Sequence, residues 1–259
     1  MAHLTIKGLV IRETDFGDND RYISVLTESG ARIEVLCRGV RRRGGRMANA
    51  VRLFCWSELT LFESRGKYTL NTADLVTSFW GITQDMERYA LACYLAELTS
   101  EMTDADEDCP AATRLLLYAL RALSDGSRDP TVIKAAFELR LMAETGFAPD
   151  LSCCSACGGP LGEEIWFSPR EGMARCAACI ERLGYLGYKR LHTGTAHALS
   201  HILTAEIPRV NAFSLGEPAR SQLAQLCEEY ALARAERNFD SLKFYQSLQL
   251  LPTASEFKT

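Results

Sequence analysis

The chain has 259 residues, of which 47% are hydrophobic and 24% are charged, a composition typical of an ordinary globular protein rather than of a disordered or fibrous one. Its length favours two domains over one. No apolar run approaches the roughly 18 to 20 residues of a membrane span, and the first residues lack a signal-peptide pattern, so we expect a cytoplasmic protein without membrane association.

The net charge of −4 conceals an uneven distribution of charged side chains. Residues 1–80 carry 12 basic and 9 acidic side chains, whereas the remaining residues carry 17 basic and 24 acidic ones. This asymmetry predicts that the N-terminal third meets a polyanion, while the rest of the chain meets protein or solvent.

Residues 4 to 75 are predicted to form short strands, because β-branched and aromatic residues alternate locally with polar ones between turn-forming segments. The five expected strands are 4–12, 21–27, 32–38, 53–62 and 67–73. Turn residues such as Ser64-Arg65-Gly66 favour hairpin connections. Five such strands predict a small closed barrel. A five-stranded OB-fold fits this pattern, and an SH3-like barrel fits nearly as well.

From about residue 84 the hydrophobic period changes from two to 3.6, which predicts helices that face a core. Two stripes carry this signal: Met86, Ala90, Tyr94 and Leu98, and then Leu116, Ala119, Leu120 and Leu123. Asp129 before Pro130 predicts the start of a third helix, which Gly146 closes. The acidic segment 104–108 is expected to be a loop between helices.

Helical spacing resumes near residue 198, after a segment rich in cysteine. A capping-box spacing at Ser214 and Glu217 then predicts the start of the last strong helix. Its inward residues are expected to be Leu223, Leu226, Cys227 and Tyr230.

The sharpest signal in the sequence is a pair of C-x-x-C motifs. Cys154 and Cys157 are followed after 18 residues by Cys176 and Cys179. Two motifs at this spacing place four thiolates where a tetrahedral Zn(II) site can close, and four cysteines leave no open coordination position. We therefore predict one structural zinc ion per chain, rather than a metal ion that activates water.

The cysteines also allow other interpretations. A single C-x-x-C pair can be a redox-active dithiol, although two pairs at zinc-ribbon spacing favour the metal site. Cys153 could exchange with Cys154 as a ligand, and we treat it as a spectator. Four cysteines in apolar segments are interpreted as small core residues: Cys37, Cys55, Cys93 and Cys227.

The strongest basic feature is segment 38–52, which holds six arginines in fifteen residues and no acid. Guanidinium groups bind phosphate in bidentate fashion, and each neutralised phosphate releases counterions, so the segment is a candidate nucleic-acid-binding loop. Arg65 and Lys67 in the next hairpin are expected on the same side of the barrel. The predicted nucleic-acid-binding residues are Arg38, Arg41, Arg42, Arg43, Arg46, Arg65 and Lys67. A solvated loop without a partner is the alternative.

Aromatic residues bear on the same question, because a barrel that binds single strands also offers rings on which bases stack. Phe54, Trp56, Phe62 and Tyr68 are available. Each is more simply explained as barrel core, so none is assigned to binding.

The usual enzymatic motifs are missing: the sequence has no P-loop, no dinucleotide-binding glycine motif, no nucleophile elbow and no H-E-x-x-H motif. We therefore expect no enzymatic activity. Two alternatives stay open. One is a zinc-stabilised protein-interaction adaptor without intrinsic DNA binding, and the other is a metal-dependent nucleic-acid enzyme, which would need an open position on the metal.

Five features, taken in order, resemble the RecO family of bacterial recombination mediators. They are the opening Lys7 to Arg12, the run Gly39 to Arg43 followed by Leu53-Phe54, the helix end at Gly146 to Pro149, the two cysteine pairs, and the segment Ser241 to Lys243. Only the cysteine pattern is specific by itself. The order of all five makes the match, which covers nearly the full length.

The resemblance implies an α+β multidomain protein. An N-terminal OB-fold β-barrel for nucleic-acid binding would occupy residues 1–80, and an all-helical C-terminal domain at 81–259 would carry an inserted four-cysteine zinc ribbon at 150–185. Because many relatives have degenerate cysteines, the zinc ion would stabilise the insertion rather than serve the shared function.

The resemblance also implies a function without catalysis. RecO-like proteins bind single- and double-stranded DNA, anneal complementary strands, engage the C-terminal tail of the single-stranded DNA-binding protein SSB, and work with RecR, and often RecF, to load RecA. The DNA-contacting arginines would lie in the loop Arg38 to Arg46. Such a protein would be cytoplasmic and associated with the nucleoid.

Overall fold

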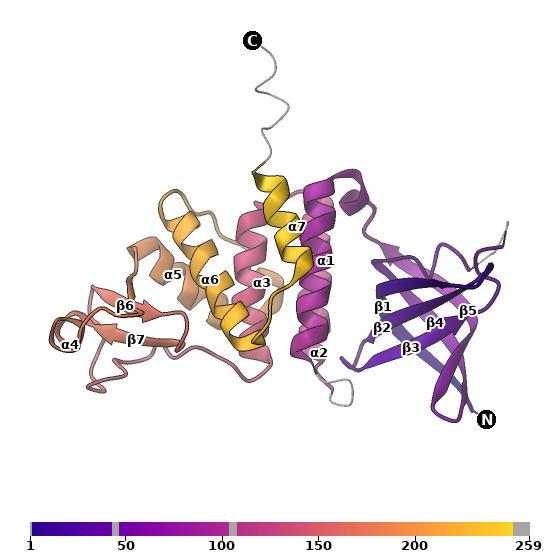
Figure 1. Ribbon diagram of the computed structural model, residues 1–259, viewed down its shortest axis with the longest axis horizontal. Helices are drawn as coiled ribbons and strands as arrows, with labels where there is room; N and C mark the ends of the chain where they lie inside the picture. The colour runs from indigo at the N-terminus through magenta and orange to yellow at the C-terminus, as the bar shows by residue number, and fades with distance from the viewer. Residues whose placement is uncertain (1, 43–46, 104–107, 251–259) are drawn as a thin grey trace, which may run out of the picture.

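The computed structural model describes residues 2–42, 47–103 and 108–250, which form three regions in a row (Figure 1). A β-barrel lies at one end, a bundle of helices in the middle, and a small three-stranded sheet at the other end. Within these residues no helix is both long enough and apolar enough to cross a membrane.

The barrel consists of five strands: β1 (Ala2–Phe16), β2 (Asp20–Thr27), β3 (Arg32–Cys37), β4 (Cys55–Ser64) and β5 (Lys67–Ser78). They close in the order β1-β2-β3-β5-β4. The long β1 completes the ring, because it pairs with β4 through residues 2–9 and with β2 through residues 8–16. A register shift between Val10 and Arg12 bends β1 between its two partners. This closed five-stranded barrel confirms the predicted OB-fold.

The interior of the barrel is filled by the apolar members of the alternating pattern, among them Val10, Ile23, Val25, Val35, Leu59 and Leu61. Cys37 belongs to this core, and burial raises the pKa of its thiol to about 12. Cys55 and Cys227 are buried as predicted, whereas Cys93 is only half-buried.

The helical region follows the short 3-10 helix η1 (Trp80–Gln84). Its helices are α1 (Met86–Met102), α2 (Pro110–Asp125), α3 (Pro130–Glu144), α5 (Thr193–Thr204), α6 (Ala219–Ala235) and α7 (Asp240–Gln249), with a second 3-10 helix, η2 (Ile207–Arg209), after α5. Asp129 caps α3 as predicted, since its carboxylate accepts a hydrogen bond from the Thr131 N–H at 2.8 Å. Helix α3 packs against α1, α2, α5 and α6 and is therefore the centre of the bundle.

The helices differ from the sequence prediction in three details. Met86 is 64% exposed, although its spacing placed it in the core stripe. The predicted capping box at Ser214 does not form: α6 starts at Ala219, and the Glu217 carboxylate accepts a hydrogen bond from the Ser221 N–H. Helix α7 was not predicted, because only two of its ten residues are buried and the apolar signal is correspondingly weak. Most of the acidic loop 104–108 lies outside the described residues.

Two charged side chains of α3 lie inside the bundle. Lys134 is buried, with Nζ 2.7 Å from Glu138 Oε1 and 2.7 Å from Glu228 Oε2. Tyr94 donates a hydrogen bond to Glu138 at 2.7 Å. Burial disfavours the ammonium form, but the two carboxylates outweigh it and raise the pKa of Lys134. One ionic network thus joins α1, α3 and α6.

The barrel packs directly against the helices. Three barrel residues belong to the same continuous apolar core as α1 and α2: Leu9, Leu26 and Phe54. The Thr113 hydroxyl on α2 donates to the carbonyl of Thr27 at 3.0 Å. Gly30 has a φ of +99°, and a Cβ there would lie only 2.3 to 2.5 Å from backbone atoms of Cys109. The junction therefore leaves no space for a side chain at this position.

We expect Gly30→Ala to lower the free energy of unfolding by roughly 2 to 4 kcal/mol, because the new side chain adds both backbone strain and a collision. Gly66→Ala is the matched control. Gly66 also has a positive φ, +73°, but nothing lies within 4 Å of its would-be Cβ, so only roughly 1 to 2 kcal/mol should be lost. Urea denaturation measures both. Equal losses would show that the junction is loosely packed.

Candidate functional site

The candidate metal centre lies in the insertion between α3 and α5. This insertion contains β6 (Ile165–Ser168), β7 (Met173–Cys176), the short helix α4 (Ala177–Leu183) and β8 (Lys189–Arg190), with the strands in the order β7-β6-β8. Lys189 is paired with Glu229 of α6 at 2.6 Å, and the Tyr230 hydroxyl donates to the carbonyl of Phe147 at 2.7 Å. The insertion is therefore attached to the helical bundle through α6.

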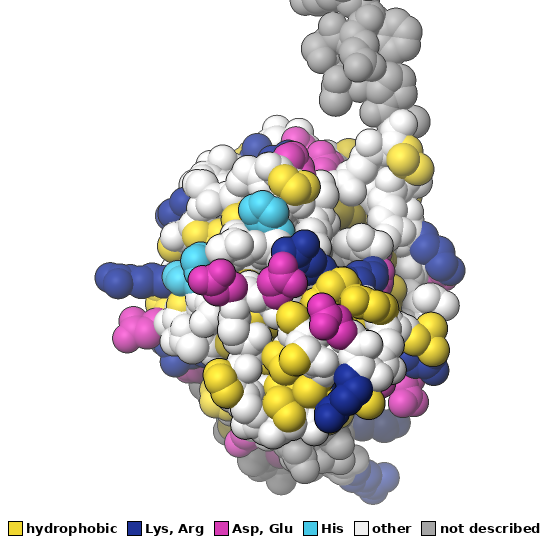
Figure 2. Space-filling view, turned by 90° about the vertical axis from the view of Figure 1, so that its left-hand side faces the viewer, with side chains coloured by type: hydrophobic (Ala, Val, Ile, Leu, Met, Phe, Trp, Pro, Cys, Tyr) yellow, Lys and Arg dark blue, Asp and Glu magenta, His cyan; other side chains and the backbone are white. Residues whose placement is uncertain are grey.

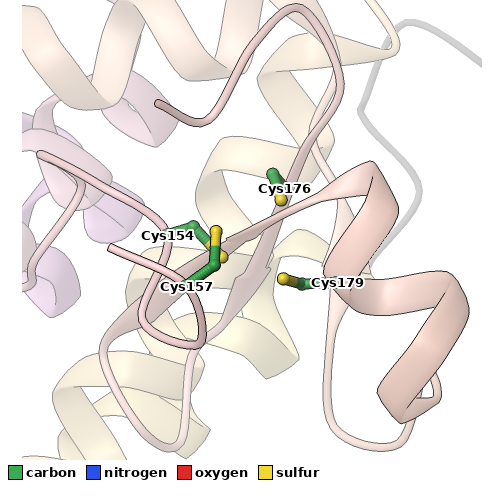
Figure 3. A group of neighbouring side chains, drawn as sticks. All are labelled: Cys154, Cys157, Cys176 and Cys179. Atoms are coloured by element: carbon green, nitrogen blue, oxygen red, sulfur yellow. The ribbon is translucent and has the colours of Figure 1, made fainter. Parts of the chain in front are cut away.

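The structure brings the four predicted metal ligands together. The sulfur atoms of Cys154, Cys157, Cys176 and Cys179 all lie within 4.8 Å of one another and turn towards a common point (Figure 3). A tetrahedral site with metal–sulfur bonds of about 2.3 Å places its sulfurs about 3.8 Å apart, so small shifts would bring the four thiols onto an ion. Cys153 is not part of this cluster, in agreement with its predicted role as a spectator.

Local backbone geometry explains how each pair turns. The Gly158 N–H donates to the carbonyl of Cys154 at 2.8 Å, and Gly158 has a φ of +70°, a conformation that favours glycine. Cys176 ends β7 and is the N-cap residue of α4, while Cys179 lies in the first turn of that helix. One turn at Cys154–Gly158 and one at the start of α4 thus bring the four sulfurs together.

Two thiols of the cluster differ in how readily they ionise. Burial opposes ionisation of Cys154, but hydrogen bonds from backbone N–H groups, those of Cys176 and Ala156 among them, outweigh it and lower its pKa to about 6. Burial, and then hydrogen bonds that the Cys179 S–H donates to the other sulfurs, raise the pKa of Cys179 to about 12. One thiolate is therefore already available near neutral pH, and a bound cation would replace the remaining protons.

The candidate nucleic-acid interface is the arginine loop, defined here as residues 38–54 between β3 and β4. Arg38, Arg41 and Arg42 are exposed on it. Arg43 and Arg46 lie outside the described residues. Arg52 is exposed on the same loop but was not among the predicted contacts, although it belongs to the same run of arginines in the sequence. The loop thus presents at least four guanidinium groups to solvent.

Acidic residues of the barrel hold the start of the arginine loop in place. The Arg41 guanidinium lies 3.3 Å from Asp15, and the Gly39 N–H donates to the Asp20 carboxylate at 2.7 Å. Arg21 bridges Asp15 and Glu13 at 2.9 and 2.7 Å. The β1–β2 hairpin therefore holds the start of the loop at Gly39 and Arg41, and the charge of Arg41 is already paired.

The structure does not bring Arg65 and Lys67 to the arginine loop. β4 begins at Cys55, directly after the loop, and runs for ten residues before the hairpin that carries these two side chains (Figure 1). At about 3.3 Å per residue this is roughly 33 Å, so the two basic segments lie at opposite ends of β4. Their expected position on one side of the barrel is wrong, and their part in binding stays a prediction.

The aromatic residues are divided between core and surface. Phe54 is only 2% exposed and packs edge to face against Tyr89 of α1, with ring centroids 6.0 Å apart. It belongs to the junction with the helices and cannot stack on a base. Trp56, Phe62 and Tyr68 are half-buried. None of the four is a fully exposed stacking platform.

Comparison with known proteins covers nearly the whole chain. Residues 1–79 match the family model described as recombination protein O N terminal, and residues 83–243 match recombination protein O C terminal. The DNA repair protein RecO of Symbiobacterium thermophilum is 31% identical over 252 residues, 96% of this chain and 99% of that one. The DNA repair protein RecO of Acetivibrio thermocellus is 29% identical, over 96% of this chain and 98% of that one. The DNA repair protein RecO of Bacillus subtilis is 26% identical, over 86% of each chain.

We expect the purified protein to contain one metal ion per chain, and Cys157→Ser to reduce this content to near zero because a tetrahedral site loses a quarter of its ligands. Cys157 is the exposed member of the cluster, so its substitution disturbs packing least. Elemental analysis measures the content. Cys153→Ser is the matched control and should retain the ion. Loss of metal in the control variant, with retention in Cys157→Ser, would mean that Cys153 is a ligand.

Proposed function

The chain belongs to the RecO family of DNA repair proteins, and from this premise we propose that it is a recombination mediator. In this role it binds single- and double-stranded DNA, anneals complementary strands and, with RecR and RecF, helps RecA to load onto single-stranded DNA coated by SSB. One observation carries the proposal: exposed arginines cluster on a loop of the OB barrel.

The proposed mechanism is electrostatic and contains no chemical step, so we propose that the protein is not an enzyme. Two complementary strands repel each other through their phosphates. Arginines that neutralise phosphates of both strands lower this repulsion and release counterions, which favours pairing. Contact with SSB would bring the protein to coated DNA, and the proposed place of work is the cytoplasm, at the nucleoid.

We propose that the metal of the insertion is zinc, since four thiolates in a closed shell are the usual ligands of structural zinc. Cys154, Cys157, Cys176 and Cys179 would hold it. The ion would crosslink the loop before β6 to the start of α4, and thereby stabilise the insertion. Four cysteine ligands exclude a catalytic water from such a shell, which argues against the metal-dependent enzyme alternative.

A protein contact at the insertion end fits the same role. The last residue of α4 and the segment between α4 and β8 expose large apolar side chains: Leu183 at 54%, Tyr185 at 52% and Leu186 at 98%. Apolar side chains gather among charged ones on this end of the molecule (Figure 2). Such patches favour binding of a protein partner, and we propose RecR and the SSB tail as the partners of this protein.

An adaptor without DNA binding is the second candidate. One observation favours it: Arg41 is already paired with Asp15, so the arginine loop carries less free charge than its sequence suggests. This candidate predicts affinity for a protein partner and none for DNA.

The salt dependence of single-strand binding tests the arginine loop. If about four to six phosphates are neutralised, log K should fall against log salt with a slope of about −3 to −4. Arg42 has no ion pair within the described ranges, so Arg42→Ala should flatten the slope by about one unit. Arg41→Ala should flatten it less, because Asp15 already neutralises that guanidinium. Replacing Arg41, Arg42 and Arg43 together should remove about two units.

Arg121→Ala is the matched control for these slopes. Arg121 lies on α2, outside the arginine loop, and is exposed and paired with Asp125 at 2.8 Å. Fluorescence anisotropy at several salt concentrations gives the slopes. A triple variant with the slope of the wild type would remove the arginine loop from the interface.

An annealing assay tests the function as a whole. Two complementary oligonucleotides are coated with the cognate SSB and mixed with and without the protein. We expect acceleration, because the mediator must act on both DNA and SSB. No acceleration, in buffer where bare strands do anneal, would favour the adaptor.

A further inference from the structure

A cleft of about 320 Å³ opens where the barrel meets the helices. The end of the arginine loop, β5, η1 and the start of α1 supply its walls. Four of its lining residues are Arg52, Leu75, Trp80 and Tyr89. It is therefore a direct continuation of the arginine loop, and it joins one cationic side chain to two large aromatic ones.

Trp80 is held out in solvent by its neighbours. Phe79 is 6% exposed and Ile82 fully buried, so both anchor η1 in the core, yet Trp80 between them is 63% exposed. The Gly81 N–H donates to the Ser124 hydroxyl at 3.1 Å, and a Cβ on Gly81 would lie 2.0 Å from the Ser124 carbonyl oxygen. Because the backbone on both sides is fixed, the residue that carries the exposed indole has a defined place at the edge of the cleft.

The second aromatic wall is fixed from behind. Tyr89 is 39% exposed, and its ring packs edge to face on the buried Phe54. Leu75, 45% exposed, adds apolar surface from β5. Exposure of a tryptophan, a leucine and part of a tyrosine ring side by side is unfavourable in water. This favours a flat, largely apolar ligand that covers the three side chains.

The charges of the cleft favour a ligand that carries phosphate. Arg52 is exposed, and no ion pair holds it in the part of the chain that the structure describes. Glu13 also lines the cleft, but its carboxylate accepts hydrogen bonds from Arg21 at 2.7 Å and from the Leu53 N–H at 3.3 Å. The Arg52 guanidinium is therefore available to a ligand, whereas the Glu13 carboxylate is already hydrogen-bonded within the protein.

We propose that the cleft holds one unstacked base of a DNA single strand, against Trp80 and Tyr89, while the adjoining phosphates lie on Arg52 and the arginine loop. The inference rests on the proposed DNA binding and adds to it a site that separates single from double strands. A volume of about 320 Å³ cannot take a protein helix, which is about 10 to 12 Å across with its side chains, but it can take a single aromatic ring system. A base in a duplex is stacked on both faces and cannot enter.

Binding of labelled DNA by wild type and Trp80→Ala tests the proposal. We expect the variant to bind a thymidine oligonucleotide about 5- to 100-fold more weakly, the effect of losing one base–aromatic stack. Its affinity for a duplex, and for an oligonucleotide of the same length without bases, should equal that of the wild type. The salt slope should also stay unchanged, because no phosphate contact is removed.

Two further variants keep the test specific. Tyr118→Ala removes an aromatic ring that is 45% exposed on α2, outside the cleft, and should bind every DNA as the wild type does. Trp80→Phe keeps a flat ring and should restore most of the affinity. If the proposal holds, a thymidine oligonucleotide also quenches tryptophan fluorescence of the wild type, and this quenching is lost in Trp80→Phe.

These measurements distinguish failure of the base site from failure of DNA binding as a whole. Equal weakening of single-strand and duplex binding in Trp80→Ala, or no weakening at all, would overturn the base site while leaving DNA binding intact. A wild-type protein that binds none of the DNA would overturn the proposed function, and the base site with it.

Discussion

The arrangement of the molecule depends on the buried ionic network of α3. A charge inside a protein is tolerated only when it is paired, and loss of one partner from such a pair costs about 3 to 5 kcal/mol. Lys134 meets this condition through Glu138 on its own helix and Glu228 on α6. From the same helix Arg140 donates to the carbonyls of Ile202 and Ala205, at 3.0 and 2.7 Å, where α5 ends. Helix α3 thereby fixes α1, which faces the barrel, and α5 and α6, which carry the insertion.

The acidic residues that hold the start of the arginine loop in place also reduce its positive charge. Asp20 and Asp15 hold its first residues through Gly39 and Arg41, so the loop does not have to lose as much conformational freedom when it meets a ligand. The same acids weaken its positive field. Among the described residues, Arg42 and Arg52 have no such acidic partner. They lie in the two described stretches of the loop, 38–42 and 47–54, and Arg52 lines the cleft beside Trp80.

The features that could be predicted from the sequence are those encoded in neighbouring residues. The spacing of the two C-x-x-C pairs predicts a cluster of four thiols that could hold a metal ion, and Asp129 before Pro130 predicts a helix start from local hydrogen bonding. The capping box predicted at Ser214 is a local signal that failed, but the other features that the sequence did not reveal depend on contacts between distant segments. The position of Arg65 depends on the length and direction of β4. The pairing of Arg41 depends on Asp15, which lies in a hairpin earlier in the chain. The exposure of Trp80 depends on how its neighbours pack against α2. The order of residues along the chain does not by itself reveal these contacts.

The barrel and the insertion lie on opposite sides of the helical bundle (Figure 1). If the barrel binds DNA as proposed, the insertion end stays open, and the two ends do not compete for space. A partner bound there would be tethered near the DNA, and tethering of this kind raises effective affinity by about 100- to 10,000-fold without any new contact. Here the tether is the helical bundle between the barrel and the insertion. It is stiff at the barrel end, because Gly30 packs on Cys109 and the barrel shares its core with α1. It would therefore set the orientation of the partner as well as its local concentration.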